Sequence, residues 1–280
     1  MTARHDLRAE SPAADRSAGS SAAEPLAHAL LERRLSTRSI LASFLLGRKP
    51  PRARARLLVA WCGLFDVNEG AARVALSRMV DTGDLVAADG HYELAGPLRS
   101  RQHVQDVALA PPTEWSATAW SGAWRLALVR PGGRSASARA ALRNAALTVR
   151  MVELREGVWG RPDNLPRQQT QAAEVISEQC EMWTGVPDGP VGLAAFRLDE
   201  WAARGGELLD HLTRTTAAIC SHPGDGPALV TAFEVWAAAL QHLRHDPLLP
   251  ETLLPERWPA PRLRSAYRDY ERAMADSIRA

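Results

Sequence analysis

A helix pattern followed at once by a hairpin pattern, at residues 68–94, restricts the fold of this chain more than any other feature. The segment reads NEGAARVALSRMVDTGDLVAADGHYEL. Asn68 can cap the helix and Gly83 ends it. DLVAA and HYEL flank Asp89-Gly90, a strong short-range indication of a β-hairpin. The apolar residues on one face of the predicted helix are Ala72, Ala75, Leu76, Met79 and Val80.

Two further helices are expected before this segment. STRSILASFLLGR predicts the first, with Ser36 or Thr37 as N-cap, and Gly47 and Pro50-Pro51 stop it. The second is expected at about 52–62, with Gly63 at the C′ position. Three helices and a hairpin over residues 35–95 predict a winged helix-turn-helix.

The remainder of the chain predicts two more domains. Residues 1–34 lack apolar periodicity and are expected to be a disordered tail, and residues 96–120 a mostly polar connector. Over 121–188, strand patterns at 124–130, 151–159 and 180–187 alternate with helical ones, which favours a ferredoxin-like middle domain. Residues 189–280 predict a helical C-terminal domain with helices at 199–220, 227–245 and 260–277. The predicted fold class is α+β and multidomain.

Charge and cysteine usage exclude several classes of protein. The formal net charge is +2 and the cysteines number three, Cys62, Cys180 and Cys220, so the chain is no polycation and has no CxxC pair. Neither a disulfide framework nor a cysteine-rich zinc site is indicated. The longest apolar run, 57–65, is too short to span a bilayer, and the N-terminus lacks a signal-peptide pattern. A cytoplasmic protein without a membrane partner is expected.

Arg73, Ser77 and Arg78 fall on the side of the predicted helix at 68–82 that faces away from its apolar stripe. Such a face is commonly just solvated. A recognition helix, however, needs small residues behind it and arginines in front, which contact guanine bidentately. The neighbouring sequence favours this second interpretation, because a block without acidic residues contains Arg33, Arg34, Arg38, Arg48, Lys49, Arg52, Arg54 and Arg56.

Four motifs together resemble the PaaX-type transcriptional regulators of phenylacetate catabolism. They are STRSIL, NEGAARVALSRMVDTGDL, GVWGRP and HLRHDPLLPETLLPERWP, and the resemblance covers about residues 35–275. The last motif is the most specific of the four. The resemblance implies a dimeric repressor with a winged helix, a ferredoxin-like middle domain and a helical C-terminal domain. It also implies binding to a pseudo-palindromic double-stranded DNA operator, and release by phenylacetyl-CoA, an aryl-CoA thioester.

The family's recognition-helix pattern, Arg-x-Ala-Leu-Ser-Arg, falls on residues 73–78 here. Two departures concern phosphate contacts: Asp81 and Asp84 follow the helix, and the wing offers only His91 and Tyr92. Weight therefore shifts to the arginines at 48–56. The residues predicted to contact DNA are Thr37, Arg38, Arg48, Lys49, Arg52, Arg54, Asn68, Arg73, Ser77, Arg78, His91 and Tyr92.

An effector site is predicted around the segment ELREGVWGRP. Most of the nine tryptophans lie beyond the winged helix, where each either packs in a core or lines an apolar pocket. Arginines near Trp159 either form surface ion pairs or meet a CoA phosphate. The residues predicted to bind a small-molecule effector, an acyl-CoA thioester, are Trp124, Arg155, Trp159, Arg161 and Trp183.

Catalysis and metal binding are not expected. A nuclease with a ferredoxin-like domain needs a carboxylate at the end of its first strand, but WRLALVRP ends in arginine and proline. No hydrolase, zincin, P-loop or dinucleotide motif is present, and no cofactor is predicted. His242, His245 and Asp246 do not make a complete ligand set, and DPLLPETLLPERWP is expected to be a rigid corner. The main alternative is a pathway-specific regulator, either a repressor or an activator, that answers a different ligand.

Overall fold

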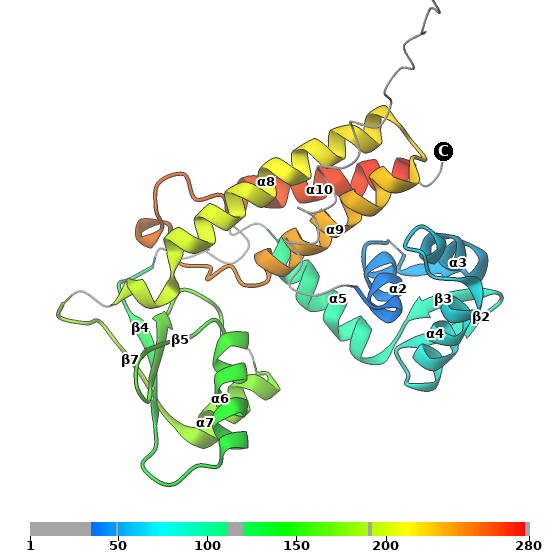
Figure 1. Cartoon of the computed structure of the whole chain (residues 1–280). Coiled ribbons are helices and arrows are strands. Elements are labelled where there is room, and N and C mark those ends of the chain that lie inside the picture. Colours follow the sequence, from blue (N-terminus) through cyan, green and yellow to red (C-terminus); the bar gives the residue numbers. More distant parts are fainter. Residues whose placement is uncertain (1–34, 49, 111–119, 168, 190–191, 278–280) are drawn as a thin grey trace, which may run out of the picture.

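The protein is described from a computed structural model, which describes residues 35–48, 50–110, 120–167, 169–189 and 192–277. The tail expected at 1–34, Lys49 and Trp115 lie outside these residues. The chain is of mixed α and β structure and ends in a helical region, as expected of the α+β class. Figure 1 shows the described elements falling into an N-terminal unit (residues 35–110), a middle unit (120–189) and a C-terminal helical unit (192–277).

The N-terminal unit combines helices with a small antiparallel sheet of strand order β1-β3-β2. Its elements in chain order are α2 (Thr37–Leu46), β1 (Arg52–Arg54), α3 (Ala55–Gly63), α4 (Glu69–Asp81), β2 (Leu85–Ala88), β3 (His91–Leu94) and α5 (Gly96–Leu109). The helix-then-hairpin pattern at 68–94 is confirmed as α4, β2 and β3. These elements lie together around α2 and α3 (Figure 1).

Local chemistry explains where these elements begin and end. The Ser36 hydroxyl accepts a hydrogen bond from the backbone N–H of Ser39 at 3.1 Å, and Asn68 Oδ1 accepts one from Ala71 at 2.8 Å. Both are N-cap bonds that satisfy an N–H left open at the start of a helix. Asp89 and Gly90 have φ of 49° and 73°, the left-handed pair that a two-residue type I′ hairpin turn requires.

The helix expected at 52–62 is wrong in its first turn. Residues 52–54 form strand β1, in which Ala53 is paired with Tyr92 of β3, and α3 begins at Ala55. Gly63 is the last residue of α3 rather than its C′ residue, and the left-handed residue after this helix is Asp66, with φ 58°. Residues 52–54 form a strand because they pair with β3, almost forty positions away. No local sequence pattern indicates such a distant pairing.

The first part of the polar connector expected at 96–120 is helical, because α5 occupies Gly96–Leu109. Leu98 and Gln105 are buried, and the Gln105 amide donates to the Tyr267 hydroxyl at 3.3 Å. The helix packs between α2 and α9 (Gly226–Leu243) of the C-terminal helical unit. Tertiary contacts therefore stabilise a segment that is too polar to show a clear apolar stripe.

The middle unit is a four-stranded antiparallel sheet with two helices on one face, as Figure 1 shows. Its elements are β4 (Trp124–Val129), α6 (Ala136–Thr148), β5 (Val152–Arg155), β6 (Val158–Pro162), α7 (Gln171–Gln179) and β7 (Cys180–Gly185). The strand order is β5-β6-β4-β7. The single strand expected at 151–159 is instead a hairpin, which turns at Gly157 with φ 72°.

The C-terminal helical unit contains three long helices, as predicted, which pack side by side (Figure 1). They are α8 (Leu198–Ser221), α9 (Gly226–Leu243) and α10 (Ala260–Ser277), with 3₁₀ turns η2 (Leu193–Phe196) and η3 (Glu251–Leu253). Among the described residues no helix is both long and apolar enough to cross a membrane.

The buried apolar side chains form three clusters. The largest runs from Ile40 through the N-terminal unit into α8, α9 and α10 and ends at Met274, so these two units share one core. A second lies between the sheet and α6 and α7, around Trp159. The third joins Trp124, on the other face of the sheet, to Phe196 and Leu249. The buried side of α4 therefore belongs to the same core as the C-terminal helices.

Candidate nucleic-acid interface

Helix α4 presents a polar face that carries two arginines to solvent. Ala72, Leu76 and Met79 are buried against the rest of the N-terminal unit, whereas Arg73, Ser77 and Arg78 are exposed. The small residue at position 72 lets α4 pack closely on α2 and α3. Two cations and a hydroxyl thus lie together on the outer side of one helix, an arrangement that suits contacts to a phosphate backbone and to base edges.

The two arginines on this face differ in their surroundings. Arg73 pairs with Glu69 at 2.7 Å, one helical turn earlier, and both side chains are largely exposed. An exposed pair of this kind is weak, so Arg73 can exchange Glu69 for a stronger anion. Among the described residues no carboxylate pairs with Arg78. Of the two arginines, only Arg73 would therefore have to give up an ion pair with a described carboxylate in order to contact DNA.

Asn68 and Thr37, both predicted to contact DNA, lie at the N-terminal ends of α4 and α2. The Asn68 side chain is occupied as the N-cap of α4. Thr37 is the half-buried first residue of α2. Their backbones remain at helix N-termini, where N–H groups favour phosphate.

Arg38 forms an internal ion pair with Asp84. Its Nε and Nη2 donate to Asp84 Oδ2 at 2.9 and 2.7 Å, and the Asp84 side chain is only 6% exposed while that of Arg38 is 53% exposed. Thr82 Oγ1 donates to the same oxygen at 3.2 Å. Arg38 thus balances the charge of Asp84, and the Asp84 carboxylate has a structural role. Arg38 is largely used in holding α2 to the start of β2.

Removal of the Asp84 carboxylate is expected to destabilise the protein. Asp84→Ala leaves the Arg38 guanidinium and the Thr82 hydroxyl without their acceptor, so we expect the free energy of unfolding to fall by about 2 kcal/mol. Urea unfolding followed by circular dichroism measures the change. Glu93→Ala, which breaks the exposed Arg99–Glu93 pair of 2.7 Å, is the control and is expected to change stability by less than about 1 kcal/mol. Equal effects would contradict a structural role for Asp84.

Strand β1 adds a second set of cations. Arg52 and Arg54 are exposed on either side of the buried Ala53, on an edge strand paired with β3 opposite Glu93 and His91. Arg48 lies elsewhere: its guanidinium carbon is 5.3 Å from the centre of the Phe44 ring and its Nε donates to the carbonyl of Arg52 at 3.3 Å. Of these three arginines, Arg52 and Arg54 are thus exposed on a strand, whereas Arg48 lies over an aromatic ring.

The wing contributes little positive charge. His91 Nδ1 lies 3.0 Å from the carbonyl of Asp89, at the hairpin turn. Tyr92 is half-buried and packs against the main core, since β3 is the central strand of its sheet. Val86 is exposed. Of the two wing residues predicted to contact DNA, His91 is therefore the one that lies at the hairpin turn and outside the main core.

The five residues predicted to bind an effector do not come together. Trp124 and Trp159 are both buried, but on opposite faces of the middle sheet. Arg143 lies over the Trp159 ring, 5.7 Å from its centre. Trp183 is 58% exposed on the edge strand β7, and Arg155 is exposed on the opposite edge strand, β5. The tryptophans inside the sheet therefore serve in packing.

Arg161 is buried and its donors are used internally. It donates to the carbonyls of Pro162 at 3.0 Å and Leu248 at 3.2 Å, and to Asn164 Oδ1 at 2.8 Å. Burial, reinforced by neighbouring Arg150, lowers the pKa of Arg161 to about 9. Its contact with Leu248 ties the middle unit to the corner at 246–259. A phosphate of a CoA molecule would have to displace these bonds.

Among the described residues, the N-terminal unit contains neither an ionised thiol nor a cluster of metal ligands. Burial raises the pKa of Cys62 to about 11, so this thiol stays protonated in the core. His242 Nε2 lies 3.0 Å from the carbonyl of Trp201, whose ring stacks on the imidazole, and burial lowers the pKa of His242 to about 4. In the part of the chain that the structure describes, no three metal-ligand side chains cluster.

The fold and the site define a class of protein: an α+β chain whose N-terminal unit presents an arginine-bearing helix beside a small sheet. The chain belongs to the PaaX-like family. The family model described as "PaaX-like protein" matches residues 36–98, and that described as "PaaX-like protein C-terminal domain" matches residues 196–279. The resemblance found in the sequence is thereby confirmed as to family.

The chain is also similar to a solved structure. The uncharacterized protein Rv0674 from Mycobacterium tuberculosis is 38% identical in sequence and superposes with a TM-score of 0.69. The similarity covers 88% of this chain and 98% of that one, and therefore includes the middle unit. No curated protein matches the chain.

Proposed function

We propose that this protein is a sequence-specific DNA-binding transcriptional regulator in which α4 reads the major groove. The observation that carries the proposal is the joint exposure of Arg73, Ser77 and Arg78 on a helix whose opposite face is buried. Membership of the PaaX-like family favours the same function. Arg52 and Arg54, which are exposed on the edge strand β1, would contact phosphates.

The three units are proposed to be domains with distinct roles. Residues 35–95 would be a winged helix, with α3 and α4 as the helix-turn-helix and β2 and β3 as the wing; the topology supports this. The strand order β5-β6-β4-β7 and the succession β4-α6-β5-β6-α7-β7 support a ferredoxin-like middle domain at 121–188. Residues 189–280 would form the helical domain, and α5 would connect the first two.

The regulator is proposed to act as a homodimeric repressor that a small-molecule effector releases from DNA. A dimer would place two α4 helices on half-sites about 34–36 Å apart, or a multiple of this distance, along a pseudo-palindromic operator. An effector must bind one dimer geometry better than the other to change DNA affinity. The first candidate effector is an aryl-CoA thioester, which is proposed from family likeness. The second candidate is a different ligand, because the five residues predicted to bind the thioester are dispersed.

A nucleic-acid-processing enzyme is the less favoured alternative. Strand β4, the first strand of the middle sheet, ends at Val129 and is followed by Arg130, which donates to the carbonyls of Ser177 and Glu178 at 3.1 and 2.7 Å. A metal-dependent nuclease would need a carboxylate at such a strand end. Cation-assisted cleavage therefore has no support at this position.

A gel-shift experiment tests the proposed function. The full-length protein is mixed with DNA from its own promoter region, in excess competitor DNA, and then titrated with phenylacetyl-CoA and with phenylacetate. We expect a specific shift that the thioester alone releases. A shift indifferent to both compounds would retain DNA binding and reject the thioester as effector. No shift from folded protein at low salt would overturn the DNA-binding function.

The role of β1 predicts a change in salt dependence. In the double variant Arg52→Gln/Arg54→Gln we expect weaker binding to specific and competitor DNA alike, because phosphate contacts carry no sequence information. The slope of log affinity against log salt concentration should become shallower by about 1 for each lost phosphate contact. Fluorescence anisotropy over a series of salt concentrations measures this slope. An unchanged slope would show that β1 does not contact DNA.

A further inference from the structure

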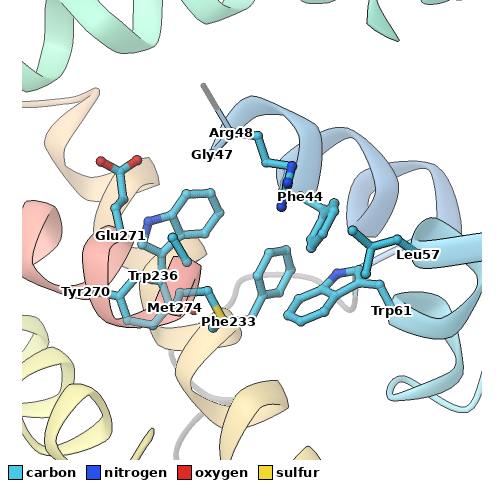
Figure 2. A pocket seen from close by; sticks show the side chains of 12 residues that line it. Phe44, Gly47, Arg48, Leu57, Trp61, Phe233, Trp236, Tyr270, Glu271 and Met274 are labelled. Carbon is cyan, nitrogen blue, oxygen red and sulfur yellow. The ribbon is translucent and has the colours of Figure 1, made fainter. Parts of the chain in front are cut away.

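A cavity lies between the N-terminal unit and the C-terminal helical unit. Figure 2 shows it walled on one side by Phe44, Arg48 and Trp61 of the N-terminal unit and on the other by Phe233, Trp236 and Tyr270 of α9 and α10. Its volume is about 250 Å³. The cavity is distinct from the residues that the sequence predicted for an effector, none of which lines it.

Aromatic rings continue across both walls. Phe44 and Trp61 have centroids 4.8 Å apart, and Trp61 meets Phe233 from the opposite wall at 5.3 Å with an interplanar angle of 75°. Phe233 in turn stacks with Trp236 at 5.4 Å. Walls of this composition favour a flat aromatic ligand, because ring faces and edges attract another ring in offset or edge-to-face geometry.

The walls also contain polar groups that the described residues leave unused. Trp61 Nε1, Trp236 Nε1 and the Tyr270 hydroxyl are buried and have no hydrogen-bond partner among the described residues. Buried polar groups are nearly always bonded, so three such groups around one cavity require an explanation. A ligand with an acceptor atom that inserts beside these rings would provide one.

Charge is distributed unevenly around the cavity. Figure 2 shows the Arg48 side chain reaching toward Phe44, whereas Glu271 lies at the other end, beside Trp236. The guanidinium carbon of Arg48 is 5.3 Å from the Phe44 ring centre. A guanidinium carries five N–H donors and recognises planar acceptors such as carboxylates.

The cavity volume limits the size of the ligand. Sites for drug-sized ligands measure roughly 300–1,000 Å³, and this cavity is smaller. One or two fused aromatic rings with a short substituent match this space, whereas a whole CoA thioester exceeds it. The aromatic walls and Arg48 thus define a compact, flat ligand with an acceptor group.

We propose that this cavity binds a small planar aromatic molecule whose acceptor or anionic substituent faces Arg48, and that its binding alters DNA affinity. The second part rests on the proposed DNA-binding function. The physical basis of the coupling is that α2 and α3 form one wall and also pack directly against α4. A ligand that contacts both walls changes how α4 is held relative to α9 and α10, and differential contacts of this kind are what couples two sites.

Calorimetric titration of the full-length protein without DNA tests the site. The probes are indole, indole-3-carboxylate and tryptamine, which share one ring system and differ in charge. We expect indole-3-carboxylate to bind most tightly and tryptamine most weakly. No binding of any probe at millimolar concentration would overturn the site, and a preference for tryptamine would overturn the role given to Arg48.

Substitutions that fill the cavity locate the binding. Ala275→Leu adds bulk to the α10 wall and is expected to weaken indole-3-carboxylate binding at least tenfold, whereas Ala203→Leu, the same change on the exposed side of α8, should leave it unchanged. Ser43→Leu fills the cavity from the α2 side and serves if Ala275→Leu does not fold, as judged by circular dichroism. Binding by a folded cavity-filled variant at wild-type strength would overturn the location.

Two further measurements complete the test. In Arg48→Leu the preference for indole-3-carboxylate over indole should disappear, and a retained preference would contradict the contact. Saturating indole-3-carboxylate should change the anisotropy-derived Kd for promoter DNA at least threefold in wild-type protein and not in Ala275→Leu. An unchanged Kd with calorimetric binding intact would overturn the coupling alone. If the protein binds no DNA, the proposed function fails while calorimetry still decides the site.

Discussion

Replacing Arg78 by alanine is expected to weaken specific DNA binding strongly while leaving the fold intact. Arg78 is exposed on α4, and no described carboxylate pairs with it. A bidentate arginine contact to guanine contributes about 1–3 kcal/mol of discrimination between bases, equivalent to a roughly 5- to 150-fold change in affinity. Arg73→Ala is expected to act in the same way, with the released Glu69 carboxylate adding repulsion toward DNA.

Anisotropy titrations of promoter DNA against scrambled DNA of equal length measure this discrimination. Arg262→Ala, which removes an exposed arginine from α10, is the matched control and should retain wild-type affinity and specificity. Circular dichroism and the thermal midpoint of each variant should match those of the wild type. Wild-type discrimination in either α4 variant would refute the assignment of α4 as the recognition helix.

Asp246→Ala is expected to cause the largest loss of stability of any single substitution considered. Asp246 and Arg264 have side chains each 2% exposed, and Asp246 Oδ2 accepts from Arg264 Nη2 at 2.6 Å. Asp246 Oδ1 also accepts from the backbone N–H of Leu248 at 3.0 Å. Removal of Asp246 takes the carboxylate of this ion pair away from the buried Arg264 guanidinium, so we expect the free energy of unfolding to fall by about 3–5 kcal/mol.

Denaturant unfolding measures the loss of stability in Asp246→Ala and in Glu69→Ala. The comparison distinguishes the effect of breaking a buried ion pair from that of breaking an exposed one. Glu69→Ala breaks an exposed ion pair on α4 and should change stability by less than about 1 kcal/mol. The double variant Asp246→Leu/Arg264→Met should recover much of the loss, because apolar groups can replace a buried pair. A loss below about 1 kcal/mol in Asp246→Ala would show that this pair does not hold the corner at 246–259 to α10.

The sequence predicted best where local chemistry decides structure. Capping by Ser36 and Asn68, the left-handed turn at Asp89-Gly90 and the apolar stripe of α4 each depend on residues within a few positions of one another. The exposure of Arg73, Ser77 and Arg78 follows from the same helical periodicity. The three C-terminal helices were predicted for the same reason.

The structure differs from the sequence-based expectations in segments whose partners are distant in sequence. Strand β1 exists because residues 52–54 pair with β3, and α5 because Leu98 and Gln105 are covered by other helices. Arg38 and Arg161, whose predicted roles in DNA and effector binding stay predictions, also bond internally to residues far away in the sequence. Sequence cannot distinguish an arginine that meets solvent from one that meets a carboxylate 46 positions away.

The amino-acid sequence by itself determined the family, the α+β class, the position of α4 and the side of this helix that carries its arginines. These properties depend on periodicity, capping and turn residues, which act over one or two helical turns. Tertiary structure alone decided which cations remain exposed, that the effector candidates are dispersed, and that an aromatic cavity lies between two units. The reason is physical: burial, ion pairing and cavity formation depend on contacts between residues far apart in the chain, whose register no local pattern records.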